Sequence, residues 1–410
     1  MAETVTVALV GAGGYGDFYL RALLADAATH AVQFVGVIDP TISESPIVDA
    51  LHAAGIPRYP DLASFWQATS AQLVVIAAPI HFHAPYTCDA LAHGASVLCE
   101  KPLCATLQEA RTMDEAQQTY GGFVAVGYQW SFSAAIQALK QDMLSGALGQ
   151  PRRFKARVLW PRTATYYARN NWAGRLRMPD GRWVLDSPVS NATAHYLHNL
   201  FYLLGDQRER SAQPVSVQAE LYRANSIENC DTAALRCTTA QGVEILYYAS
   251  HATADIAGPR FHLEFDQAVV TYGTEDGQHA PGLVVATWAD GRQKVYGDPF
   301  ADDARKLWQS VAAVRTGEPV ACDLAAATAH VRAINGMHES MPTIQTFPAE
   351  LIQQNDSLTW VAGLQETLIA AYDQNQLPVE VGNVPWARAG KVINLAAYTT
   401  FPQNRALAVD

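Results

Sequence analysis

The chain has 410 residues, of which 49% are hydrophobic and 16% charged, and its formal net charge is −11. This length exceeds what one compact core usually holds, so we predict two domains, and the composition argues against disorder. An acidic surface repels phosphate backbones, which excludes nucleic acid as an expected partner.

The first 130 residues alternate short apolar strands with helical segments. The chain leads directly into a strand without a signal-peptide pattern, and no apolar run is long enough to span a bilayer. We therefore expect a cytoplasmic protein with no membrane partner. Strand–helix alternation predicts a doubly wound parallel sheet, a Rossmann domain, over residues 1–130. Strands are expected at Val5–Val10, Val32–Asp39, Arg58–Tyr59, Leu73–Ala78, Ser96–Glu100 and Phe123–Tyr128, and helices at Pro85–His93 and Leu107–Tyr120.

After about residue 130 the pattern changes to strands joined by short turns. One amphipathic helix, Ala134–Ser145, precedes these strands, and two helices follow them, at Ala301–Thr316 and Leu324–Glu339. Strands without helices between them predict an antiparallel or mixed sheet, in a second domain over residues 131–410. The last 65 or so residues show no clear pattern. Strands are expected at Phe154–Trp160, Val215–Tyr222, Thr232–Thr238, Val243–Ser250, Phe261–Phe265, Ala268–Tyr272 and Leu283–Trp288.

A Gly-x-Gly-x-x-Gly motif lies directly after the first strand and opens a helix. Gly11 permits a tight turn, Gly13 lets the backbone approach a pyrophosphate, and Gly16 lets the helix pack closely on the strand. The helix N-terminus adds free N–H groups and a positive dipole end for the phosphates. A plain glycine-rich turn is the alternative, but the position of the motif predicts a dinucleotide site that includes Gly14 and Tyr15.

Asp39 ends the second strand, 23 residues after Gly16. A carboxylate there can accept hydrogen bonds from both ribose hydroxyls of an adenosine and would repel a 2′-phosphate. Residues 40–46 contain no Arg or Lys that could neutralise such a phosphate. We therefore predict NAD as the cofactor rather than NADP. The alternative role for Asp39 is that of a turn residue at a strand end.

Lys101 is the most unusual residue at the strand ends. The segments Ala77–Pro85 and Val97–Leu103 both follow apolar strands, where ligands bind in open α/β sheets. A buried ammonium is costly, so its expected use is to hydrogen-bond a substrate oxygen and lower the pKa of that oxygen. The alternative is a solvated surface lysine, the role expected for Lys140 and Lys155.

These segments resemble the Gfo/Idh/MocA family of oxidoreductases. The family shows Thr-Pro-x-x-x-His, then Ala-Leu-x-x-Gly, then Glu-Lys-Pro, and the matching residues here are 78–83, 90–94 and 100–102. The segments 127–130, 144–149 and 300–340 are also similar, so the resemblance covers roughly residues 5–340. It implies a Rossmann domain followed by an α/β domain with a large open sheet, which commonly forms the contact of a homodimer or homotetramer. It implies that Lys101 is catalytic, and we expect cofactor contacts from Ala78, Pro79, His83, Glu100 and Lys101.

A helix from Asn191 to Gly205 is predicted to carry the second catalytic group. Its apolar stripe repeats every three or four residues beside a polar stripe of Asn191, His195, His198 and Tyr202, which fits a helix lining a pocket. The family has Asp-x-x-x-His here, so the resemblance implies that His195 is the catalytic histidine, able to accept an alcohol proton. The alternative is a hydrogen-bonded structural histidine. His198 could contact substrate or face solvent.

Asn191 stands where the family has an aspartate. An asparagine can hydrogen-bond but carries no charge, so it should leave the pKa of His195 lower than a carboxylate would. Asp186, five residues earlier, could compensate from the preceding loop. Asn191 remains a candidate catalytic residue.

The loop from Pro161 to Trp183 combines aromatic, amide and guanidinium side chains. This composition suits a sugar ring, and it suits a subunit interface equally well. Substrate contacts are therefore expected from Lys101, Tyr128, Trp130, Arg162, Trp172, Asn191, His195 and His198.

The combined features predict an NAD(H)-dependent oxidoreductase that transfers a hydride between nicotinamide and a sugar, an inositol or a related polyol. Lys101 would hydrogen-bond the alcohol oxygen, and His195, alone or with Lys101, would accept its proton. Two other functions remain open: a redox-neutral glycosidase that holds NAD, and a non-catalytic protein that senses NAD or a sugar. The six cysteines are scattered, and His81 and His83 have no further ligand placed with them, so no metal site is expected.

Overall fold

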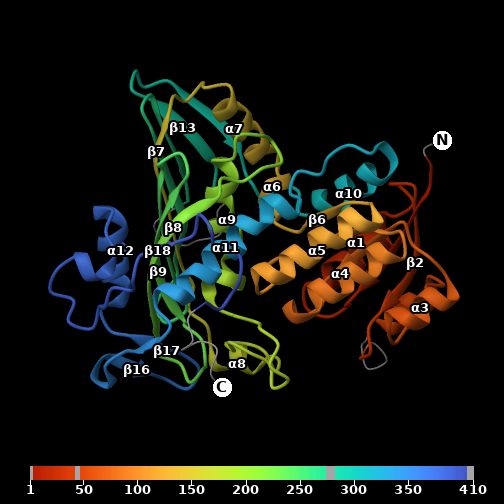
Figure 1. Ribbon diagram of the computed structural model, residues 1–410, viewed down its shortest axis with the longest axis horizontal. Helices are drawn as coiled ribbons and strands as arrows, with labels where there is room; N and C mark the ends of the chain where they lie inside the picture. Colours follow the sequence, from red (N-terminus) through yellow and green to blue (C-terminus); the bar gives the residue numbers. More distant parts are fainter. Residues whose placement is uncertain (1–2, 42–46, 274–281, 404–410) are drawn as a thin grey trace.

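The first layer of the fold is a six-stranded parallel sheet at the N-terminal end of the chain (Figure 1). The computed structural model describes residues 3–41, 47–273 and 282–403. The strand order of the six-stranded sheet, β3-β2-β1-β4-β5-β6, is that of a doubly wound sheet, with the order reversing between β1 and β4. All six predicted strands are present: β1 (Val5–Val10), β2 (Val32–Ile38), β3 (Arg58–Tyr59), β4 (Leu73–Ile76), β5 (Ser96–Cys99) and β6 (Val124–Val126).

Helices cover both faces of this sheet. The sequence Thr106-Leu107-Gln108-Glu109 has the pattern of a capping box, and the structure forms one at the start of α5 (Leu107–Tyr120). Thr106 accepts from the backbone of Glu109, and the Glu109 side chain accepts from the backbone of Thr106. The helix predicted from Pro85 begins two residues earlier, since a 3₁₀ turn (Ile80–Phe82) runs directly into it and proline fits the first turn of a helix. The helices are α1 (Gly16–Asp26), α2 (Val48–Ala53), α3 (Leu62–Ala68), α4 (His83–Ala92) and α5 (Leu107–Tyr120).

The second layer is a ten-stranded mixed sheet with the order β14-β13-β12-β11-β7-β10-β9-β8-β15, and β18 pairs with β8. Most neighbours are antiparallel, whereas β7 and β10 run parallel. The seven predicted strands are all present, and the short or exposed strands β14, β15 and β18 were not predicted. The bounds are β7 (Pro151–Leu159), β8 (Pro214–Arg223), β9 (Thr232–Thr239), β10 (Glu244–Ser250), β11 (Ala257–Phe265), β12 (Ala268–Tyr272), β13 (Val284–Trp288), β14 (Gln293–Gly297), β15 (Gln345–Thr346) and β18 (Ile393–Asn394).

Helices α9 (Ala194–Leu203) and α11 (Leu324–Ser340) lie between this sheet and the first domain (Figure 1). With α6 (Gln129–Phe132) and α7 (Ala134–Leu144) they cover its inner face. In the described part of the chain, no helix is long and apolar enough to cross a membrane.

Helix α10 (Arg305–Thr316) returns to the first domain, although it follows the second sheet in the chain. The ring of Trp308 stacks on His30 with centroids 3.9 Å apart. Arg315 donates from Nε to the carbonyl oxygen of Glu3 at 2.7 Å. Residue 130 therefore remains our proposed boundary between two domains, but α10 packs on the first of them.

The outer face of the second sheet is partly covered by the C-terminal segment, which lies on the far side from the first domain (Figure 1). Helix α12 (Leu364–Gln374) packs on β7 and β10. Lys155 of β7 donates to the carbonyl oxygen of Tyr372 at 2.7 Å, and Arg236 of β9 forms an ion pair with Glu380 at 2.6 Å. The apolar cluster beneath this segment includes Leu159, Tyr222, Leu246, Tyr248, Phe347, Val361, Leu364, Leu368 and Leu377, with β16 (Ile352–Gln354) and β17 (Thr359–Val361) at its edge.

Leu368→Ala tests whether this segment is an integral part of the fold. Leu368 is completely buried between α12 and the sheet, so the substitution leaves a cavity. We expect it to lower the free energy of unfolding by about 2–5 kcal/mol. Urea denaturation followed by tryptophan fluorescence measures the loss. The control is Gln374→Ala on the exposed side of the same helix, expected to change stability by no more than about 0.5 kcal/mol. Equal effects of the two substitutions would show that α12 is only loosely attached.

Candidate active site

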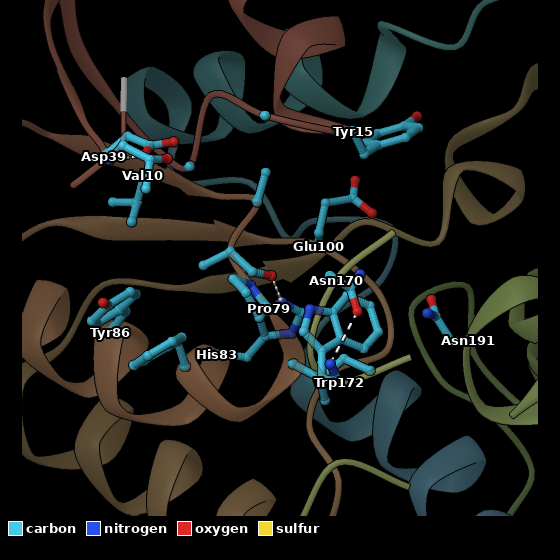
Figure 2. A pocket seen from close by; sticks show the side chains of 18 of the residues that line it. Val10, Tyr15, Asp39, Pro79, His83, Tyr86, Glu100, Asn170, Trp172 and Asn191 are labelled. Atoms are coloured by element: carbon cyan, nitrogen blue, oxygen red, sulfur yellow. Dashed lines mark hydrogen bonds between the residues drawn. The ribbon is translucent and has the colours of Figure 1, made fainter. Parts of the chain in front are cut away.

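A cavity of about 910 Å³ opens at the carboxyl ends of β1 and β4, where the strand order reverses. The second domain supplies its opposite wall through the 161–172 loop, which includes α8 (Ala164–Ala168), and through the segment before α9. Figure 2 shows Asp39 at one end of this cavity and Asn191 at the other. Of the predicted residues, the cavity is lined by Gly11, Gly13, Gly14, Tyr15, Asp39, Ala78, Pro79, His83, Glu100, Lys101, Arg162, Trp172 and Asn191.

The glycines of the first loop have the geometry that their predicted roles require. Gly11 has a φ of +84°, and a Cβ there would lie 2.7 Å from the carbonyl oxygen of Ala77. A Cβ at Gly16 would lie 2.0 Å from the carbonyl oxygen of Gly11, so only glycine lets α1 start this close to the loop. Gly16 thus packs behind the loop, whereas a Cβ at Gly13 would meet nothing within 4 Å. That open space lies where a pyrophosphate could approach the backbone.

Asp39 combines the two roles considered for it. Its Oδ2 accepts from the backbone N–H of Ala12 at 2.9 Å, and its Oδ1 accepts from the N–H and hydroxyl of Thr41, both at 2.8 Å. These bonds hold the strand end as a turn residue would, and the carboxylate also lines the cavity. Residues 42–46, which carry part of the argument against a 2′-phosphate, lie outside the described residues.

Glu100 and Lys306 form a buried ion pair beneath the cavity. The Nζ atom of Lys306 lies 2.5 Å from Oε1 of Glu100, and the Tyr19 hydroxyl donates to the same oxygen at 2.6 Å. Lys306 also donates to the hydroxyl of Tyr15 at 3.1 Å. Burial opposes ionisation of Glu100, but the charge and hydrogen bonds around it outweigh this effect and keep its pKa below the ordinary value. Glu100 therefore serves mainly to join α10 to the cavity floor.

Lys306→Met tests this pair. The substitution leaves the Glu100 carboxylate buried without its cation, and we expect a loss of about 3–5 kcal/mol in the free energy of unfolding. Urea denaturation at neutral pH measures it. The double variant Glu100→Gln with Lys306→Met removes both charges and should recover part of the loss. A Lys306→Met protein as stable as the parent would contradict the role assigned to the pair.

His83 positions two cavity loops. Its Nδ1 lies 2.8 Å from the carbonyl oxygen of Pro102, and its Nε2 lies 2.9 Å from that of Ala78. Burial lowers the pKa of His83, which favours the neutral ring with a single N–H. The ring thus donates to one loop and packs against the other. His83 lines the cavity, as predicted for a cofactor contact, but its ring nitrogens are directed at the protein backbone.

Lys101, Asn191 and Asp186 form a hydrogen-bonded chain at the second-domain end of the cavity. Lys101 donates from Nζ to both the carbonyl oxygen and the Oδ1 of Asn191, at 2.9 Å each. Asn191 in turn donates from Nδ2 to Oδ1 of Asp186 at 2.8 Å. Burial lowers the pKa of Lys101 to about 8. Asp186 was expected to compensate at His195, but its hydrogen bond runs to Asn191 and through the asparagine to Lys101.

The predicted helix from Asn191 is interrupted, which separates the two groups expected on one stripe. Residues Pro188–Ala192 form a π-helical turn, Thr193 departs from helical geometry with φ −119° and ψ 16°, and α9 begins at Ala194. Asn191 therefore faces Lys101 from the turn. His195, on α9, is not among the residues that line the cavity. Its Nδ1 is buried and has no partner among the described residues, and burial holds its pKa well below 6.5.

Three predicted substrate contacts lie in the protein interior. Tyr128, Trp130 and His198 are at most 1% exposed. His198 stacks on the Tyr128 ring with centroids 3.8 Å apart and contacts the hydroxyl of Ser131 at 3.1 Å. Every residue of α9 except His195 is buried, so His198 and Tyr202 of its polar stripe contact protein rather than a ligand. The structure thus places these side chains behind the cavity, and none of them lines its wall.

Some lining residues were not singled out from the sequence. Tyr166, Arg169 and Asn170 belong to the loop whose composition indicated a ligand or an interface, and all three line the cavity. Nothing in the local sequence distinguishes Lys306, because its role depends on a contact with a residue 206 positions away. Across the described residues, no group of three or more His, Cys, Asp or Glu side chains is placed to hold a metal ion.

Comparison with known proteins agrees with this geometry. Residues 5–128 match the Gfo/Idh/MocA family, described as an oxidoreductase family with an NAD-binding Rossmann fold. Over these residues the chain is similar to that family. The match spans the six-stranded sheet and every cavity residue of the first domain that was predicted from the sequence.

Curated proteins are similar to this chain over part of their length. The inositol 2-dehydrogenase of Ralstonia nicotianae is 27% identical over 243 residues, which are 59% of this chain and 66% of that protein. The rhizopine catabolism protein MocA of Rhizobium meliloti is 33% identical over 141 residues, 34% of this chain and 43% of that protein. The alignments thus cover less than two thirds of each relative.

Solved structures support the fold of both domains. The WlbA dehydrogenase from Bordetella pertussis, in complex with NADH and UDP-GlcNAcA, has a TM-score of 0.68 at 19% identity and covers 83% of this chain and 97% of its own. A levoglucosan dehydrogenase in complex with NADH has a TM-score of 0.66 at 17% identity, with 82% and 96% covered. At these identities the likeness establishes the two-domain fold alone.

Proposed function

We propose that the chain is an NAD(H)-dependent dehydrogenase acting on a CH–OH group of a sugar, an inositol or a related polyol. The observation that carries this proposal is the position of Lys101, on the wall of the cavity that begins at the glycine loop, with its amine held by Asn191. The residues of the first domain fit a dinucleotide: an open glycine turn at a helix N-terminus and a carboxylate, Asp39, at the second strand end. When bound, NAD supplies hydride acceptance or donation at its nicotinamide.

Asn191 orients the amine of Lys101. A lysine ammonium has three N–H donors, and two of them are used by the two oxygens of Asn191. The remaining direction carries a third N–H in the ammonium or the lone pair in the neutral amine. In the neutral form Lys101 can accept the alcohol proton as the hydride leaves, and in the charged form it can return a proton to a carbonyl oxygen.

The neutral amide of Asn191 suits this role. A carboxylate in contact with Lys101 would favour the ammonium and raise its pKa. Here the carboxylate of Asp186 contacts the amide instead, and burial lowers the pKa of Lys101 to about 8. We propose Lys101 as the group at the reacting oxygen. His195, which is uncharged at neutral pH and has a free Nδ1 among the described residues, is the second proton acceptor.

The preference for NAD is also part of the proposal. Asp39 lines the end of the cavity where the adenosine ribose would lie, and its charge disfavours a 2′-phosphate there. We further propose that the protein acts in the cytoplasm.

We propose that any homodimer or homotetramer forms outside the part of the sheet that α12 covers. The predicted contact through the second sheet needs an accessible apolar face. The outer sides of β7, β10, β9 and β8 are buried instead by the chain's own C-terminal segment. Strands β11 to β14 are left, and their outer side chains include Arg260, His262 and Glu264.

The first test is turnover of NAD⁺ to NADH on a panel of inositols, aldoses and glycosides, with Lys101→Ala as the variant. We expect one class of polyol to be oxidised. Lys101→Ala should keep the parental Kd for NAD and lose turnover by on the order of 10²–10⁴-fold, because it removes the proton acceptor. Near-full turnover by the variant would refute the assignment of Lys101. Cleavage of a glycoside without net NADH would indicate the redox-neutral glycosidase, and NAD binding without any turnover would indicate a sensor.

The pH dependence of kcat/KM tests which form of Lys101 reacts. Oxidation requires the neutral amine, so kcat/KM for the alcohol should rise with pH and level off above about 8. Reduction requires the ammonium, so kcat/KM for the carbonyl compound should fall through the same range. Lys101→Arg serves as the control, because a guanidinium keeps its proton and should abolish the transition. An alcohol oxidation rate that falls as pH rises through 8 would contradict the role of Lys101 as a base.

A further inference from the structure

Two arginines of the second domain line the cavity without a close carboxylate. Arg162 and Arg169 both belong to its wall. Arg162 forms no ion pair with any described carboxylate, and its Nε is buried without a partner. The nearest carboxylate to Arg169 is Asp186, at 3.9 Å, and that carboxylate already accepts from Asn191 and from the backbone N–H of Gly174. Each guanidinium therefore has N–H groups left for a ligand.

Other arginines of the same loop form close ion pairs with carboxylates. Arg175 lies 3.0 Å from Glu228, and Arg182 lies 2.6 Å from Asp180. Neither Arg175 nor Arg182 lines the cavity. The loop thus pairs these two cations closely with carboxylates outside the cavity. Within the cavity, Arg162 has no carboxylate partner among the described residues, and Arg169 reaches Asp186 only at 3.9 Å and donates from Nη1 to the carbonyl oxygen of Tyr166.

The two cavity arginines are also close to each other. The Arg169 guanidinium lies 3.7 Å from the centroid of the Tyr166 ring, and that of Arg162 lies 5.0 Å from the same centroid. Two like charges held against one ring repel each other, and an anion between them would relieve the repulsion. Contact with the aromatic ring restricts both side chains, which reduces the entropy lost when they bind a ligand.

The surplus of positive charge lies at the reacting end of the cavity. Lys101 lines the same cavity from the side of the first domain, and the carboxylate of Glu100 is already neutralised by Lys306. No other carboxylate lines this end in the described part of the chain, because Asp39 and Asp61 lie at the adenosine end. This concentration of cations stands out in a chain whose net charge is −11.

We propose that Arg162 and Arg169 bind an anionic group of the substrate, a carboxylate or a phosphate, so that the alcohol oxidised belongs to a sugar acid or a sugar phosphate rather than to a neutral polyol. This inference rests on the proposed dehydrogenase function and names its substrate class. Arginine forks match carboxylate and phosphate oxygens equally, so both sources share one chemistry. The pyrophosphate of NAD has its own site at the glycine loop and the start of α1, near Gly13 and Gly14.

The test compares matched pairs of compounds on the parental protein with NAD: glucose against glucuronate, glucose against glucose 6-phosphate, and inositol against inositol phosphate. We expect the charged member to be preferred in kcat/KM by on the order of 100-fold, because two charge-assisted hydrogen bonds are gained. A higher kcat/KM for glucuronate than for glucose would show that the arginines bind a carboxylate. A higher kcat/KM for the phosphorylated compounds than for glucose or inositol would show that they bind a phosphate. Equal or better use of the neutral members would overturn the proposal.

Arg162→Gln and Arg169→Gln then locate the anion. Each should reduce the charged-to-neutral ratio of kcat/KM by on the order of 10-fold, mainly through KM. Arg175→Gln, outside the cavity, is the matched control and should keep the parental ratio. Loss of NAD affinity in the two cavity variants, with an unchanged ratio, would assign the arginines to the cofactor and overturn the proposal.

Calorimetric titration of the NAD-loaded protein with the same compounds separates this inference from the proposed function. Selective binding of glucuronate or glucose 6-phosphate that is lost in both cavity variants would support the anion site even if no compound were oxidised. Oxidation of neutral sugars, with no selective binding of the charged ones, would support the dehydrogenase and reject the anion site.

Discussion

The buried ion pair of Glu100 and Lys306 is the constraint on which the cavity depends. Neither charge could lie in the interior alone, because desolvating an unpaired ion costs more than most single interactions contribute. The pair joins Glu100, directly after β5, to Lys306 of α10, and Glu100 also accepts a hydrogen bond from Tyr19 of α1. Lys101 is the residue after Glu100. The backbone position of the proposed catalytic group is therefore set by α10, which follows β14 of the second sheet in the chain.

Much of the fold could be predicted from the sequence, because its signals are local. Apolar runs predicted five of the six strands of the first sheet, β3 (Arg58–Tyr59) being the exception, and the capping-box pattern at Thr106 matches the start of α5. What could not be predicted depends on contacts distant in the sequence. Lys140 and Lys155 looked like surface lysines, yet both are buried, with their amines satisfied by backbone carbonyl oxygens such as those of Tyr202 and Tyr372. The role of Lys306 likewise depends on a residue distant in the sequence, because its amine pairs with Glu100.

The site shows the same division. The glycine loop, Asp39 and Lys101 line one cavity, as their positions at strand ends indicated. Helical periodicity misled at Asn191, because the polar stripe continues from Asn191 to His195 across Thr193 although the helical backbone does not. His198 fitted the polar stripe, but the stripe packs against Tyr128 and Ser131. Periodicity reports that a helix face is polar and cannot report whether a ligand or the protein meets it.

The charges along the cavity follow an order that explains how its two ends can differ in role. Carboxylates of Asp39 and Asp61 line one end, where they suit ribose hydroxyl donors, and the cations Lys101, Arg162 and Arg169 line the other. Between them the backbone N–H groups of the glycine loop and the start of α1 provide a positive potential for phosphates. A dinucleotide is therefore favoured in one orientation, with its adenosine at the acidic end. An anionic substrate is favoured at the opposite end, beside Lys101, where its negative charge would also offset the repulsion between the arginines and the amine. Replacing the family's aspartate with Asn191 fits this arrangement, since a carboxylate at the cationic end would compete with the substrate anion for the same guanidinium groups.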